Sequence, residues 1–216
     1  MLRTTLLFAL LILGLTACNN SGEAVADAVE ETTDVAADTA DEVMNAVSDA
    51  ETMVGDGFEV KVLDGTIKSP RKELSGAVAG VPVTINYGSP AVNGRVIYGD
   101  LVPYAKVWRT GANEATRITF GEDVAVGAEG ETLPAGTYSL FTLPDSRDSW
   151  TIIFNKVPDQ WGAYDYNAAE DALRVSGVSM PNEDKAERMD FTIDGEMVKL
   201  MWDDLIVGFP VAKAAK

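Results

Sequence analysis

From residue 69 onward, short runs of apolar and β-branched residues alternate with clusters of Gly, Pro, Asn and Asp. Residues 81–87 show the pattern most clearly, because every second residue from Val81 to Tyr87 is apolar and would lie on one face of a strand. Runs of this length bounded by turn-forming residues are typical of strands. We find no long segment in this region with the spacing of an amphipathic helix. The pattern therefore predicts an all-β domain.

The runs together predict about ten strands over roughly 140 residues, which favours a two-sheet β-sandwich or a jelly roll. Asn93 and Gly94 form a turn signal inside this series, and Asp194 and Gly195 predict a hairpin near its end. A further short hairpin is expected at residues 58–67. The expected strands are residues 81–87, 95–98, 105–110, 116–120, 137–143, 150–155, 172–178, 188–193, 196–202 and 205–211.

Residues 1–18 have the layout of an export signal, with a positive charge at Arg3, an apolar run over residues 6–15 and small residues at the end. Residues 15–18, LTAC, resemble the lipobox of bacterial lipoproteins, in which the cysteine is acylated and becomes the first residue of the mature protein. Cys18 is the single cysteine of the chain and the expected lipidation site, although an ordinary secretory signal with an incidental cysteine is the alternative. By resemblance to enteric sorting rules, the Asn that follows favours the outer membrane of the cell envelope.

Residues 19–57 are rich in Ala, Val, Asp, Glu and Thr, and they contain no aromatic residue and no proline. Small apolar residues recur there at steps of three and four, which allows a helix with a narrow apolar stripe. The stripe would serve a weak coiled coil, but its lack of Leu and Ile favours a self-repelling linker. We therefore divide the chain into a signal peptide at residues 1–18, an acidic tether at 19–57 and a β-sandwich domain at 58–216, with a core at about 69–211.

The chain has 34 Asp and Glu residues against 17 Lys and Arg, and its formal net charge is −17. An acidic chain without a basic cluster repels phosphate backbones, so nucleic-acid binding is not expected. With no His and one Cys, the chain lacks the residues for His-dependent catalytic triads and His-containing zinc sites. Asp145 and Asp148 are candidate calcium ligands, but two carboxylates fall short of the roughly six to eight oxygens that this ion takes. They are expected to be solvated turn residues, and no metal site is predicted.

Chemically capable residues concentrate in residues 101–120, between two predicted strands. Trp108 offers a flat aromatic face, and Arg109 a forked guanidinium. Asn113 and Glu114 follow in a Gly-containing connection and add an amide and a carboxylate. This mixture suits a polar ligand. The competing interpretation is that Arg109 and Glu114 form a structural ion pair that fixes the loop.

Residues 156–171 form a second informative segment, because they combine several aromatic side chains with little regular pattern. Trp161 is the candidate ligand contact within it, and Asn155 and Lys156 add an amide and a cation at its start. Loops of this length are usually binding loops or lids, or else packed Ω-loops whose side chains cover a core. Both interpretations remain open from the sequence.

Four ordered blocks of the sequence resemble a known bacterial family: SPRKELSG, INYGSPAVNGRVIYGDLVPYAKVWRTGANEATRITF, LPAGTYSLFTLP and WTIIFNKVPDQWGAYDY. The chain is similar to the bacterial domain-of-unknown-function family 2911, from residue 69 to about residue 178. The resemblance implies an exported, largely β domain, and it brings no activity, cofactor or catalytic residue to this chain. The positions that match the family's blocks are Trp108, Arg109, Gly111, Asn113, Glu114, Asn155, Lys156, Trp161 and Gly162.

These observations lead to the hypothesis of a cell-envelope protein, attached to the membrane through lipidated Cys18, that binds a polar small molecule or glycan at one end of a β-sandwich. Sugars fit best, because their apolar faces stack on indole and their hydroxyls pair with amide and charged groups. The sequence predicts no particular cofactor and no oligomeric state. The candidate ligand-binding residues are Trp108, Arg109, Asn113, Glu114, Asn155, Lys156 and Trp161.

A carboxylate-dependent hydrolase of envelope glycans is the alternative, with Glu114 as the weak candidate for a catalytic acid or base and Lys156 or Arg109 to stabilise charge. Glycoside hydrolysis ordinarily needs a second carboxylate, for which Asp100 and Asp165 are the nearest candidates. A third hypothesis is a protein-interaction module without a small ligand.

Overall fold

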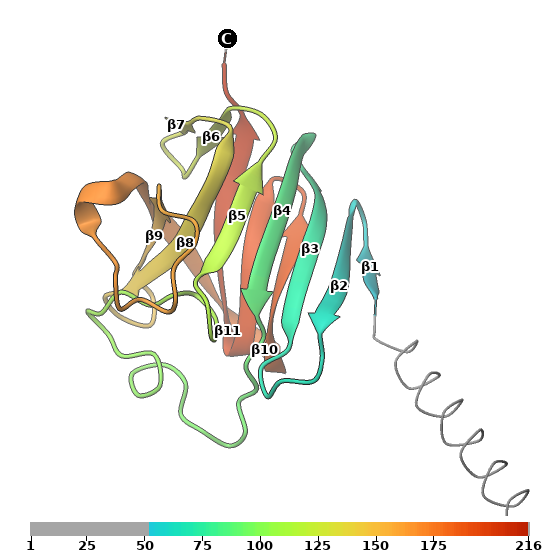
Figure 1. The fold of residues 1–216 in the computed structure, drawn as a ribbon, viewed down its shortest axis with the longest axis vertical. Helices are drawn as coiled ribbons and strands as arrows, with labels where there is room; N and C mark the ends of the chain where they lie inside the picture. The colour runs from blue at the N-terminus through green and yellow to red at the C-terminus, as the bar shows by residue number, and fades with distance from the viewer. Residues whose placement is uncertain (1–51, 216) are drawn as a thin grey trace, which may run out of the picture. The chain divides into compact units, whose positions relative to one another are not determined.

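The computed structural model describes residues 52–215, so the predicted signal peptide, Cys18 and most of the predicted acidic tether lie outside the described residues. The described part is built almost entirely of strands, which confirms the all-β prediction (Figure 1). Its single helical element is a 3-10 turn, η1, at Ala168–Glu170. Within residues 52–215, no helix has the length and apolar composition needed to cross a bilayer.

Eleven strands form one antiparallel sheet, in the order β1-β2-β3-β4-β5-β8-β9-β10-β11-β6-β7. Its two edges, β1 and β7, are strands of three residues each. The strands are β1 Met53–Gly55, β2 Phe58–Asp64, β3 Arg71–Val78, β4 Val81–Gly88, β5 Thr116–Phe120, β6 Val124–Val126, β7 Glu131–Leu133, β8 Gly136–Pro144, β9 Trp150–Asn155, β10 Asp171–Asp194 and β11 Met197–Lys213.

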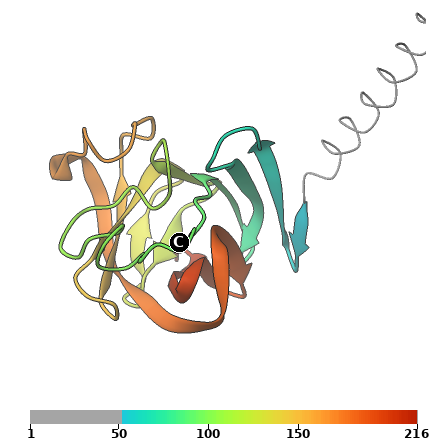
Figure 2. The same cartoon turned by 90° about the horizontal axis from the view of Figure 1, so that it is seen from below.

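The sheet curls on itself because β10 is long enough to belong to two layers. Its first part, from Asp171 to Gly177, pairs with β9, and its remainder, from Val178 to Asp194, pairs with β11. Figure 1 shows β10 and β11 behind β4, β5 and β8, and Figure 2 shows the same arrangement from below. The two layers expected of a sandwich are therefore parts of one continuous sheet, and the four predicted strands after residue 171 are two long ones.

Apolar side chains from the two layers meet in one core. The predicted alternation in β4 is confirmed, since every second side chain from Val81 to Tyr87 is at most 2% exposed. Tyr87 packs edge-on against Phe191 of β10 with ring centroids 5.0 Å apart, and Phe154 of β9 packs edge-on against Phe209 of β11 at 5.5 Å. Edge-to-face contacts of this kind add to the free energy of burial and hold the layers in register.

Two predicted strands, residues 95–98 and 105–110, are wrong. Both lie in the long connection between β4 and β5 and form no ladder, and some of the apolar side chains of that connection, such as Ile97 and Trp108, are buried over the end of the sheet while Val96 is exposed. The backbone of Trp108 makes an isolated two-way bridge to Thr142 of β8, with N to O distances of 2.7 and 3.0 Å. Left-handed backbone at Thr110 and Asn113 (φ 56° and 63°) then turns the chain into β5.

Three connections approach one another beside β4 and β5, and they create the site described below. The β2–β3 and β4–β5 connections leave the same end of the sheet, at the bottom of Figure 1. The β9–β10 connection crosses the outer face of β8, where the Ser139 hydroxyl donates to the Val157 carbonyl at 2.7 Å. It then reaches the β4–β5 connection, and the Ala115 amide donates to the Gln160 carbonyl at 3.0 Å.

Candidate functional site

A cleft of about 710 Å³ lies where these three connections meet, and we call it the loop cleft. Its volume is in the range of natural ligand pockets. The β9–β10 connection forms one wall, and the β2–β3 connection with the start of β3 forms the other. The lining residues are Asp64, Ile67, Arg71, Asn113, Glu114, Ala115, Arg117, Pro158, Asp159, Gln160 and Trp161.

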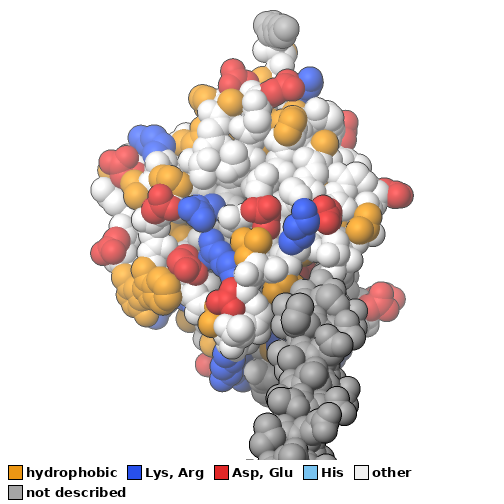
Figure 3. All heavy atoms as spheres, turned by 45° about the vertical axis from the view of Figure 1, so that its right-hand side comes forward, with side chains coloured by type: hydrophobic (Ala, Val, Ile, Leu, Met, Phe, Trp, Pro, Cys, Tyr) orange, Lys and Arg blue, Asp and Glu red, His pale blue; other side chains and the backbone are white. Residues whose placement is uncertain are grey.

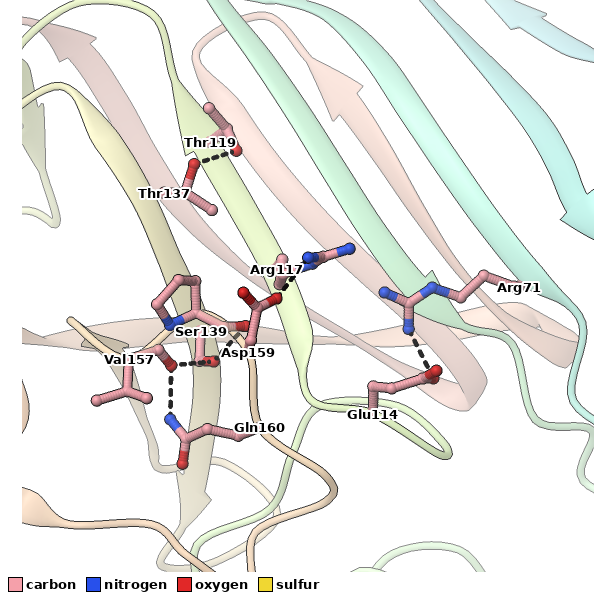
Figure 4. Close-up of polar contacts among 10 residues, drawn as sticks. Arg71, Glu114, Arg117, Thr119, Thr137, Ser139, Val157, Asp159 and Gln160 are labelled. Carbon is pink, nitrogen blue, oxygen red and sulfur yellow. Dashed lines mark hydrogen bonds and ion pairs between the residues drawn. The ribbon is translucent and has the colours of Figure 1, made fainter.

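Two ion pairs place charge in the loop cleft (Figure 4). Arg71 of β3 lies 3.0 Å from Glu114, and Arg117 of β5 lies 2.7 Å from Asp159. Burial lowers the pKa of Arg71, and the Glu114 carboxylate opposes that shift. The acids are open to solvent, with 47% of the Glu114 side chain and 80% of the Asp159 side chain exposed. Exposed ion pairs contribute little to stability, so the Arg117–Asp159 pair is free to rearrange around a polar ligand, whereas Arg71 is only 13% exposed and is held more firmly.

The wall that carries Trp161 is held by its backbone. The Gly162 amide donates to the Asn113 carbonyl at 3.1 Å, and Glu114 forms an isolated bridge with Trp161. The left-handed backbone of Asn113 directs its carbonyl to this contact, and Asn tolerates that conformation better than most residues. With its backbone fixed, Trp161 keeps 60% of its surface exposed and presents an indole to the loop cleft.

Asn155 anchors the base of the same wall. Its side-chain amide donates to the Asn167 carbonyl at 3.1 Å and to Asp171 Oδ1 at 2.9 Å. Its side-chain oxygen Oδ1 accepts hydrogen bonds from the Val157 backbone amide and from Gln160 Nε2, both at 3.1 Å. Asn155 is fully buried, so its hydrogen-bonding groups serve the connection itself.

The loop cleft continues onto the outer face of β4, β5 and β8. A second hollow of about 250 Å³ shares Arg117 with the loop cleft. Hydroxyl groups of this face bond to one another, as Thr119 and Thr137 do at 2.9 Å (Figure 4). Figure 3 shows acidic and basic side chains interspersed on the neighbouring surface rather than gathered by sign. The hollow is lined by Thr84, Asn86, Arg117, Thr119 and Thr137.

Comparison with known protein families identifies one match. The family described as "Protein of unknown function (DUF2911)" matches residues 69–211. The chain belongs to this family. The predicted resemblance is thereby confirmed, while curated proteins and solved structures contain no significant match. The DUF2911 match includes every lining residue of the loop cleft except Asp64 and Ile67.

The structure brings together only part of the predicted set of candidate ligand-binding residues. Asn113, Glu114 and Trp161 line the loop cleft, whereas Trp108 and Arg109 line a different cavity next to it. Asn155 is buried as described above. Lys156 lies outside the lining of both cavities, with its nearest acid, Glu170, at 3.8 Å.

The ion pair proposed between Arg109 and Glu114 is wrong. Glu114 pairs with Arg71, which is 43 positions away in the sequence, and Arg109 forms no ion pair within the described part of the chain. The two side chains are neighbours in sequence, but the turn at Asn113 separates them into different cavities. Arg109 therefore has no acidic partner among the described residues.

Sequence reasoning missed Arg71, Arg117, Asp159 and Gln160. The strand period offered a signal for Arg117, because a residue between the inward-facing Thr116 and Ile118 must point to the outer face. Arg71 and Asp159 carried no such signal, since they approach the site only through the fold.

Carboxylates are the groups of the loop cleft with hydrolytic potential. Glu114, Asp64 and Asp159 line it, and the previously considered Asp100 and Asp165 do not. Hydrogen bonds from Thr66 lower the pKa of Asp64. Among residues 52–215 there is no group of three or more acidic or cysteine side chains that could hold a metal ion. The arrangement can therefore donate and accept hydrogen bonds in a wet, charged cleft beside an aromatic face.

Proposed function

We propose that this DUF2911 domain is a binding module for a hydroxyl-rich ligand, a glycan or a similar polar molecule, and that the ligand occupies the loop cleft. The observation that carries the proposal is the exposed indole of Trp161 beside a cleft of about 710 Å³ that also holds two Arg–carboxylate pairs. With 60% of its surface in water, the indole is accessible for stacking on a ligand in the loop cleft.

The chemistry of the lining matches sugar recognition. A pyranose ring presents an apolar face, which an indole can cover, and hydroxyls around its edge, which need both donors and acceptors. Arg71 and Arg117 supply donors, Glu114 and Asp159 supply acceptors, and Gln160 supplies both. The ion pairs keep these groups hydrogen-bonded before a ligand arrives.

The adjoining hollow supports an extended ligand. Its threonine hydroxyls and the Asn86 amide are short, polar and attached to strands, so they offer fixed hydrogen-bonding groups. Because Arg117 belongs to both hollows, a chain of sugar units bound at Trp161 would continue along the outer face of β4, β5 and β8.

We further propose that the protein acts at the bacterial cell envelope, held to the outer membrane by acylated Cys18, with residues 19–57 as its tether. The support is the lipobox pattern, in which the single cysteine follows an apolar run. Several acyl chains on one residue bury enough methylene groups for stable attachment.

The test is a screen of envelope oligosaccharides and peptidoglycan fragments by thermal shift and calorimetry. We expect Trp161→Ala to weaken binding by at least about tenfold, the cost of losing roughly 1.4 kcal/mol of stacking. The matched control is Tyr164→Ala, which removes an aromatic side chain from the same connection that is 86% exposed and does not line the loop cleft. Both variants should melt within about 2 °C of the parent, because exposed substitutions change stability little.

Three results would contradict the proposal. They are full affinity in Trp161→Ala, an equal loss of affinity in Tyr164→Ala, and no binding of any glycan, the last of which would favour a protein-interaction module. A fourth result concerns the hydrolase alternative, which the three carboxylates of the loop cleft support. Turnover of a bound glycan that Glu114→Gln abolishes without loss of binding would establish an enzyme.

A further inference from the structure

A second cavity, of about 250 Å³, adjoins the loop cleft and differs from it in charge. We call it the cationic pocket. Its charged lining residues are Lys68, Arg95 and Arg109, and its lining contains no Asp or Glu. The chain has 34 acidic and 17 basic residues, so this positively charged lining is opposite in sign to the net charge of the chain. The cationic pocket and the loop cleft share Asn113.

Two buried donors in the lining of the cationic pocket have no acceptor. Within the described residues, the buried side-chain polar atoms without a hydrogen-bond partner are Arg109 Nε and Trp202 Nε1. Trp202 is 1% exposed and stacks on Trp108, with ring centroids 5.8 Å apart and an interplanar angle of 18°. Buried donors are nearly always satisfied, so two unpaired donors on residues that line one cavity point to an acceptor that a ligand there would supply.

The charge of Arg109 points to the same missing group. Burial lowers the pKa of Arg109, and no carboxylate opposes the shift. Arg71 in the loop cleft is also partly buried, but there Glu114 compensates. Buried charges in proteins are ordinarily paired. Arg109 therefore lacks both a hydrogen-bond acceptor at Nε and a negative charge.

The other two cations have different roles. Arg95 is partly committed, because its Nε donates to the Val92 carbonyl at 3.0 Å and its Nη2 to the Ala91 carbonyl. Those bonds fix its guanidinium at the pocket wall without neutralising it. Lys68 is exposed and adds positive charge at the mouth. Indole and guanidinium groups donate but never accept, so only an acceptor can satisfy the two orphan atoms.

We propose that the cationic pocket binds the carboxylate or phosphate group of a small anionic ligand, with Arg109 and Trp202 as its buried donors. The volume supports a group of few atoms, since it lies below the range of about 300–1,000 Å³ for drug-sized ligands and far above the roughly 30 Å³ of one water molecule. Oxyanions accept several hydrogen bonds at once and carry the charge that Arg109 lacks. The site is separate from the loop cleft, where the guanidinium groups already face acids.

The experiment titrates the purified full chain, in detergent and at constant ionic strength, with inorganic phosphate, succinate and glucose. We expect phosphate or succinate to raise the melting temperature and to give saturable heat, and glucose to do neither. Stabilisation by phosphate alone identifies a phosphate group as the ligand chemistry, and stabilisation by succinate alone identifies a carboxylate.

Two variants test the named donors. Arg109→Met keeps the unbranched stem of the side chain as far as the position of Nε and removes the charged guanidinium, and should weaken anion binding by about tenfold or more. Trp202→Phe keeps an aromatic ring against Trp108 and removes Nε1, and should weaken binding severalfold. The matched control is Arg117→Met, which removes a guanidinium from the loop cleft and should leave anion binding unchanged.

A second measurement separates this role from simple packing. Without any anion, Arg109→Met should melt no lower than the parent, because it removes a partly buried charge that has no acidic partner among the described residues. The proposal is overturned if neither anion binds, if Arg109→Met binds them as tightly as the parent, or if Arg117→Met loses them equally.

Discussion

Replacing Asn155 with alanine should destabilise the domain strongly, because this buried amide makes four hydrogen bonds that hold the β9–β10 connection. Three of them go to neutral groups, at about 1 kcal/mol each, and one goes to the Asp171 carboxylate, at about 1.5–3 kcal/mol. Allowing water to replace some of these bonds, we expect a loss of about 4 kcal/mol in the free energy of unfolding. For a domain of this size that corresponds to a fall of roughly 8–16 °C in melting temperature.

The assay is urea and thermal unfolding followed by circular dichroism. Asn182→Ala is the matched control, because the Asn182 side chain makes one bond, to the Asp203 carbonyl at 3.0 Å, and should lose only about 1 kcal/mol. If Asn155→Ala unfolds within 1 kcal/mol of the parent and yet loses glycan binding, our reasoning is refuted. Asn155 would then be the ligand-binding residue that the sequence pattern predicted.

Two further predictions concern alkaline pH and the N-terminal cysteine. Burial raises the pKa of Tyr87 and Tyr98, and burial together with Asp171 raises the pKa of Tyr166 to about 12. The unfolded chain therefore releases these protons first, so the contribution of these tyrosines to stability should be constant below pH 10 and fall as the pH rises toward 12, and a urea midpoint that stays flat from pH 9 to pH 11 would contradict this. Cys18→Ser should leave the β domain folded but move the protein out of the membrane fraction, and its retention in membranes would disprove lipid anchoring.

Strands whose two faces meet different environments could be predicted from the sequence. β4, β5, β8 and β9 were recognised because apolar residues alternate or cluster between turn residues. The same signal failed at residues 95–98 and 105–110, since burying apolar side chains over the end of a sheet leaves the same pattern as burying them in its face. The continuity of β10 was also missed, because its register shifts near Ala186 break the alternation without ending the strand.

The candidate site was predictable where its residues are neighbours in the chain. Asn113 and Glu114 were found from their own loop, and Trp161 from a loop that is unusually aromatic. Their partners were not, because Arg71 is 43 positions from Glu114 and Arg117 is 42 positions from Asp159. Charge pairing across such distances follows from strand order, which a single sequence does not encode locally.

The two edges of the sheet bear on how the protein behaves at high concentration. An open antiparallel sheet normally exposes unpaired amides and carbonyls along its outer strands, and these can template addition of another chain. Here both outer strands, β1 and β7, are only three residues long, so each offers a very short row of free backbone groups. The two ends of the strand order therefore give strand addition little to start from, and the longer edges of the described sheet are the outer sides of the β10–β11 ribbon, where Val178–Asp194 forms a ladder with β11 alone.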